Sequence, residues 1–160
     1  MSDYTIEVKL DENRSESGII VIKKNGKSVF NAEALGRGNK GNGITWDQKD
    51  GNTPTGTYTA TKWEDTSNWP MSSYGPNGAI RLVPSSGNAL IASTDHKRSG
   101  FLIHGGAPGG KDYWRGEGEL RATQGCIRVS NETINKLRKL LLDELNSSSV
   151  TVKVYTMEKK

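Results

Sequence analysis

The stretch Ile19-Ile20-Val21-Ile22-Lys23-Lys24-Asn25-Gly26-Lys27-Ser28-Val29-Phe30 contains the clearest hairpin signal in the chain. Two apolar, β-branched runs flank the Asn-Gly dipeptide, which supplies the positive φ angles of a type I′ turn. Upstream, Ile6, Val8 and Leu10 alternate with other residues, which is the period of a half-buried strand. The first part of the chain is therefore predicted to be antiparallel β-structure.

Further strand signals follow along the rest of the chain. They lie at 57–63, 79–83, 89–91, 101–104 and 150–154. The 19 glycines indicate many turns, and a hydrophobic content of 32% is low for a helical bundle. We therefore predict a mostly β fold of the α+β class with long loops.

One segment near the end of the chain has the period of a helix. Ile134, Leu137, Leu141 and Leu145 recur on one helical face, and Asn131 is a suitable N-cap. This main helix is expected to pack on the sheet. We also expect its first N–H groups to point toward the turn that precedes it.

Length, charge and composition limit the classes of function. A chain of 160 residues fits one domain, 1–160, with a net charge of +4 spread along the sequence. No basic helix or basic-aromatic repeat points to nucleic acid, and no apolar run approaches the roughly 20 residues of a membrane span. One cysteine and two histidines without close spacing do not form a zinc set, so no metal or cofactor is expected.

The chemistry is expected to centre on Cys126, in Thr123-Gln124-Gly125-Cys126-Ile127-Arg128, and on His104, in Phe101-Leu102-Ile103-His104-Gly105-Gly106. A neighbouring imidazole activates a thiol by taking its proton, so the two side chains should lie within about 4 Å. Glycine before the cysteine would let a substrate approach, with adjacent amides as an oxyanion site. The alternative is a buried structural cysteine and an unrelated structural histidine.

These segments resemble the active-site signature of the YkuD-type L,D-transpeptidases. Ile103-His104-Gly105-Gly106 is followed by a loop and then by Thr123-Gln124-Gly125-Cys126-Ile127-Arg128-Val129-Ser130-Asn131. Upstream, Gly51-Asn52-Thr53-Pro54-Thr55-Gly56-Thr57-Tyr58 is similar to the family's Thr-Pro-x-Gly-x-Tyr/Phe segment, and Ala34-Leu35-Gly36 to the end of its preceding strand. The resemblance implies a β-sandwich or barrel with one main helix after the cysteine.

The resemblance also implies an enzyme that attacks peptidoglycan stem peptides after their third residue, commonly releasing D-alanine. A thioester at Cys126 would then be resolved by an amine, giving a cross-link or D-amino-acid exchange, or by water. His104 would be the base, and the carbonyl of Gly105 would orient its imidazole. Arg128 would support the loop or bind a substrate carboxylate.

The segment before the cysteine departs from the family pattern. Gln124 stands where the family usually has histidine, and an amide cannot titrate near neutral pH. We infer that no proton transfer is needed there, and that Thr123, Gln124 and Gly125 support the oxyanion site or the loop. Tyr113 and Trp114 lie between base and nucleophile and are candidate substrate contacts.

Three functions remain open from the sequence. A cysteine acyltransferase or carboxypeptidase of the periplasm or cell wall is favoured over a non-catalytic wall-binding module and over a purely structural β-domain. The first residues lack the basic and apolar regions of a secretory signal, which suggests a trimmed leader or a leaderless route. A leaderless chain would resemble the L,D-transpeptidase-like effectors of type VI secretion systems, with an immunity protein as partner.

Overall fold

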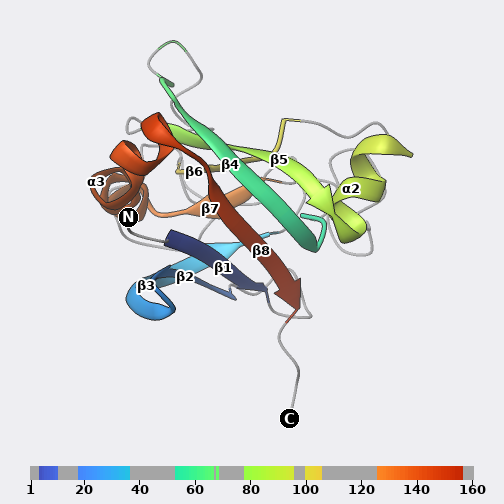
Figure 1. Cartoon of the computed structure of the whole chain (residues 1–160), viewed down its shortest axis with the longest axis horizontal. Helices are drawn as coiled ribbons and strands as arrows, with labels where there is room; N and C mark the ends of the chain where they lie inside the picture. The colour runs from blue at the N-terminus through green and yellow to red at the C-terminus, as the bar shows by residue number, and fades with distance from the viewer. Residues whose placement is uncertain are drawn as a thin grey trace, which may run out of the picture.

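The computed structural model of the protein describes residues 4–10, 18–36, 53–66, 68, 78–95, 100–105 and 126–156. Over these residues eight strands close into a barrel, and two helices lie outside it (Figure 1). The strands are β1 (Tyr4–Leu10), β2 (Gly18–Lys24), β3 (Lys27–Leu35), β4 (Gly56–Glu64), β5 (Ala79–Ser86), β6 (Leu102–His104), β7 (Ile127–Val129) and β8 (Val150–Thr156). The helices are α2 (Gly87–Thr94) and α3 (Asn131–Ser147). The predicted mostly β fold is confirmed.

The predicted hairpin is formed by β2 and β3. Lys24 pairs with Lys27 across the turn, and Asn25 and Gly26 have φ angles of 53° and 83°. Positive φ at both central residues is the requirement of a type I′ turn, which matches the right-handed twist of the flanking strands. This turn fixes the register of the meander β1-β2-β3, which forms one part of the barrel wall (Figure 1).

The barrel is closed by its last strand. β8 lies between β1, to which it is parallel, and β4, to which it is antiparallel. Val152 pairs with Ile6 on one side and with Tyr58 on the other, and all three side chains are fully buried. The alternating residues Val150, Val152 and Val154 therefore point into the barrel from a strand that pairs with both β1 and β4.

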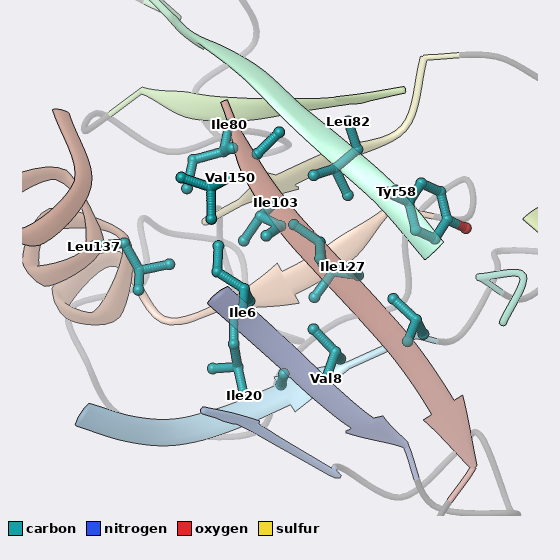
Figure 2. Close-up of a cluster of buried hydrophobic side chains, with 14 of the residues drawn as sticks. Ile6, Val8, Ile20, Tyr58, Ile80, Leu82, Ile103, Ile127, Leu137 and Val150 are labelled. Carbon is teal, nitrogen blue, oxygen red and sulfur yellow. The ribbon is translucent and has the colours of Figure 1, made fainter. Parts of the chain in front are cut away.

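The core fills the inside of the barrel with side chains from all eight strands, several of which Figure 2 shows. An eight-stranded barrel has an interior just wide enough for such filling. Leu137 of α3 belongs to the same cluster, and Figure 2 shows its side chain pointing from the helix toward the barrel. The helical face predicted from Ile134, Leu137, Leu141 and Leu145 is buried as expected. Among the helices described, none is long and apolar enough to span a membrane.

The prediction of a strand at 89–91 is wrong, because these residues lie in α2. Gly87 has a φ of 71° and turns the chain directly after β5, and the N–H of Ala89 then donates to the carbonyl of Thr55 at 2.7 Å. Ala89 and Ala92 are the buried residues of this helix, three positions apart as one helical face requires. A short apolar run does not by itself distinguish a strand from a helix.

The predicted start of the main helix also needs correction. Its N-cap is Ser130, whose hydroxyl accepts from the N–H of Thr133 at 2.9 Å, and Asn131 is the first helical residue. Strand β7 separates this N-terminus from Cys126, and three extended residues span about 10 Å. The expectation that the first N–H groups of the helix serve the cysteine turn is therefore wrong.

Candidate active site

The candidate site lies on the outer face of the adjacent strands β6 and β7. These strands are parallel, and their register pairs Ile103 with Ile127 and His104 with Arg128. Both isoleucines belong to the core cluster inside the barrel, and successive side chains of a strand point to opposite faces. His104 and Arg128 are therefore neighbours on the face directed away from the core.

The thiol of Cys126 joins the same region. Cys126 directly precedes β7 and packs with Ala79 and Leu102 in a small buried cluster separate from the main core. Leu102 lies two residues before His104 on β6, and Ala79 is the register partner of His104 on β5. The thiol and the imidazole thus share two neighbours. Their separation of about 4 Å stays a prediction.

The hydrogen bond of His104 determines its tautomer. Nδ1 lies 2.6 Å from the carbonyl oxygen of Gly105. A carbonyl oxygen only accepts, so Nδ1 carries the proton and donates it to this bond. In the neutral ring, Nε2 is then the nitrogen with the lone pair. The ring is oriented by the backbone of the next residue, the contact that the resemblance implies.

The environment of His104 keeps its imidazole neutral. Burial lowers the pKa of His104 to about 4, and the positive charge of Arg128 acts in the same direction. The hydrogen bond to Gly105 opposes both effects but is the smallest of the three. Only 2% of His104 is exposed, which explains why desolvation dominates. At neutral pH the imidazole is therefore a proton acceptor.

The resting thiol of Cys126 is bonded to a backbone carbonyl. Its Sγ donates to the carbonyl oxygen of Gly100 at 3.3 Å, and the residue is 9% exposed. Gly100 has a φ of 73°, a conformation that favours glycine, and comes two residues before β6. A thiol that donates is protonated, so its proton must move before the sulfur attacks.

Some residues near the thiol have no role in the sequence predictions. Ala79, Leu102 and Gly100 contact Cys126, and Thr53 donates a hydrogen bond to its carbonyl oxygen. Thr53 belongs to the Thr-Pro segment, but no local sequence pattern identifies Cys126 as its partner. The other three carry no chemical signal, since small and apolar residues are common in any core.

The remaining predicted site residues have mixed outcomes. Arg128 is 5% exposed and lies beside His104, while its contact with a substrate carboxylate stays a prediction. The other predicted site residues lie outside the part of the chain that the structure describes. They are Tyr113, Trp114, Thr123, Gln124 and Gly125.

Comparison with known protein families identifies the family of the chain. The family model YkuD, the L,D-transpeptidase catalytic domain, matches residues 3–154. The chain belongs to the YkuD family. Its membership confirms the resemblance drawn from the histidine, cysteine and Thr-Pro segments. A search of curated proteins found no match.

Solved structures share the fold of this YkuD domain. The helical cell shape determining protein Pgp2 from Campylobacter jejuni has a TM-score of 0.57 at 20% identity, over 99% of this chain and 50% of that one. An L,D-transpeptidase from Xylanimonas cellulosilytica has a TM-score of 0.53 at 18% identity, over 96% of this chain and 61% of that one. The chain thus spans about half to three fifths of these structures.

Proposed function

We propose that this YkuD domain is a cysteine-dependent acyltransferase acting on peptidoglycan stem peptides. Cys126 is the nucleophile and His104 the base, and the products are a free D-alanine and a transferred or hydrolysed acyl group. The bond from Nδ1 of His104 to Gly105 carries the proposal, because it leaves Nε2 as the proton acceptor. Family membership supports the substrate class.

The first half of the reaction forms a thioester. The proton of Cys126 passes to Nε2 of His104, and Sγ attacks the carbonyl carbon of the peptide bond before D-alanine. Collapse of the tetrahedral intermediate breaks the C–N bond. The imidazolium returns its proton to the leaving amine, so that D-alanine departs and the imidazole is neutral again.

The second half resolves the thioester. An amine, or water, loses a proton to Nε2 of His104 and attacks the thioester carbonyl. The C–S bond breaks, and the sulfur of Cys126 leaves as a thiolate that recovers the proton from the imidazolium. An amine acceptor gives a cross-link or an exchanged D-amino acid, whereas water gives a trimmed stem peptide.

The charge of Arg128 acts on the base and on the anions that form in both halves. Its guanidinium lies beside His104 and favours the neutral imidazole, which is the form that accepts the proton. The same positive charge favours negative charge on the sulfur and on the developing oxyanion. A buried cation next to the base therefore favours the neutral base before attack and the anions that form during attack, while it opposes the positive charge of the imidazolium.

Mass analysis of products tests this proposal. Purified tetrapeptide stems are incubated with wild type, Cys126→Ala and Cys126→Ser, each with and without a free D-amino acid. We expect loss or exchange of the terminal D-alanine with wild type alone, and a thioester adduct on Cys126 by intact mass. Circular dichroism of each variant checks that the barrel is folded.

Each alternative predicts a different result. A non-catalytic wall-binding module would bind stem peptides equally well with wild type and Cys126→Ala and release no D-alanine. Trimming or exchange without cross-links is the activity expected of the antibacterial effector considered from the sequence. Release of D-alanine by Cys126→Ala would contradict the assignment of the nucleophile.

A further inference from the structure

Thr53 joins the Thr-Pro segment to the residue proposed as nucleophile. Its Oγ1 donates to the carbonyl oxygen of Cys126 at 3.2 Å, across 73 positions of sequence. Only 2% of Thr53 is exposed. A buried hydroxyl bonded to a backbone carbonyl restrains the orientation of that peptide group, because breaking a buried hydrogen bond costs free energy.

The backbone of Thr53 is itself held from the opposite side. Its N–H donates to the carbonyl oxygen of Gly36 at 2.7 Å. Gly36 directly follows β3, whose last residue Leu35 pairs with Arg128 of β7. A Cβ on Gly36 would lie 2.6 Å from a methyl carbon of Leu10 and 3.2 Å from Oγ1 of Thr53. A side chain at this position would displace Leu10 and crowd the hydroxyl of Thr53, so glycine leaves room for Thr53 at the end of β3.

The next two residues of the segment are fixed as well. The carbonyl of Pro54 accepts from the hydroxyl of Tyr58 at 2.7 Å, and Tyr58 is fully buried in the barrel. The carbonyl of Thr55 accepts from the N–H of Ala89 in α2. Hydrogen bonds to the end of β3, to β4 and to α2 therefore hold the segment that contains Thr53.

From these contacts we propose that Thr53 is a positioning residue for Cys126. By fixing the carbonyl of Cys126 where the chain enters β7, its hydroxyl directs the thiol toward Ala79, Leu102 and the face that carries His104. The inference rests on the proposed function, since it assigns Thr53 a part in the reaction of that thiol. Thr53 contacts no reacting atom and acts only through the backbone of the nucleophile.

The test uses two substitutions of Thr53 and one matched control. Thr53→Val keeps the shape and removes the hydroxyl, whereas Thr53→Ser keeps the hydroxyl. Tyr58→Phe removes another buried hydrogen bond to the same segment, one residue further on, without a bond to Cys126. For each protein, kcat and KM are measured on stem tetrapeptides, and alkylation of Cys126 by iodoacetamide is followed by mass at pH 7.

For Thr53→Val we expect kcat to fall about tenfold with KM little changed, because small misplacements of a reacting group cost rate rather than binding. Its alkylation should slow about threefold, the rate depending on thiol activation. Thr53→Ser and Tyr58→Phe should stay within about twofold of wild type in both measurements, as the hydroxyl or its bond to Cys126 is retained.

Two outcomes would overturn the inference. One is a Thr53→Val protein with wild-type kcat and alkylation rate. The other is an equal loss in Thr53→Val and Tyr58→Phe, which would show general loosening of the segment. Alkylation needs no peptidoglycan, so it still tests Thr53 if wild type proves inactive on stem peptides. That inactivity would contradict only the proposed function.

Discussion

The two faces of β6 and β7 carry opposite chemistry on the same short strands. Toward the barrel interior, Ile103 and Ile127 pack among other apolar side chains. On the opposite face, His104 and Arg128 occupy the next register pair, and both are almost as deeply buried as the isoleucines. Burial therefore does not distinguish the structural face from the candidate catalytic one.

What distinguishes the two faces is the kind of partner that each side chain needs. An isoleucine is satisfied by any neighbour that fills the volume. A buried imidazole needs a defined hydrogen-bond partner, and the carbonyl of Gly105 supplies one at 2.6 Å. The comparison predicts that substitutions on the inner face change stability, whereas substitutions on the outer face change activity.

The largest effect is expected from His104→Asn. The amide can keep a donor near the position of Nδ1 but offers no titratable base, so kcat/KM should fall by about 10²- to 10⁴-fold. Steady-state kinetics on stem tetrapeptides give this ratio, and thermal unfolding shows whether the barrel persists. A variant that is folded and fully active would show that His104 is not the base. It would also contradict the contrast between the two faces.

On the inner face, Ile103→Ala is the matched substitution, one residue away from His104. Removing a fully buried isoleucine should lower the free energy of unfolding by about 2 to 5 kcal/mol, from lost burial and a new cavity. Urea unfolding at pH 7 measures the change. Alkylation of Cys126 in the folded protein should stay close to wild type. Unchanged stability would contradict the core position of this side chain.

The pH dependence of stability sharpens the contrast. The pKa of His104 is about 4 in the folded protein and about 6.5 when unfolded. The unfolded state therefore binds more protons between pH 4 and 6.5. The contribution of His104 to stability is complete above pH 6.5 and is lost as the pH drops toward 4. This loss amounts to roughly 3 kcal/mol. Urea unfolding of wild type and His104→Asn from pH 7 to 4 measures it, and equal slopes would contradict the assignment.

The smallest effect is expected at the far end of β7. Ser130→Ala removes the hydroxyl that accepts from the N–H of Thr133, which should lower the free energy of unfolding by about 1 kcal/mol. Because β7 separates this cap from Cys126, the alkylation rate should not change. A slower alkylation would mean that the start of α3 reaches the site after all.

Most strands of this fold were predictable because their signals are local, whereas the three-residue strand β7 was not predicted. The alternation of Ile6, Val8 and Leu10 and the Asn25-Gly26 turn each specify structure within a few residues. The pairing of β1 with β8 could not be predicted in the same way, because nothing within either strand indicates which strand it pairs with. The short apolar run at 89–91 fits either type of element, and only Gly87 and the bond to Thr55 make it helical.

The site shows the same division. His104 and Cys126 stood out because imidazoles and thiols are scarce in this chain and carry reactive groups. The support around them did not stand out. Thr53 reaches Cys126 through a backbone carbonyl, and a carbonyl is present at every residue, so no residue type marks the acceptor. Long-range contacts of this kind become visible only once the barrel has brought the segments together.

The place of β8 in the barrel has a consequence for how the protein is made. Of the strands described, β8 is the last to leave the ribosome, yet it is the one that seals the wall between β1 and β4. During synthesis the β2–β3 hairpin can form early, but β1 must wait for its second neighbour. A nascent chain that ends before β8 therefore has an open apolar interior, and the barrel that supports the thiol site can close only once β8 has been made.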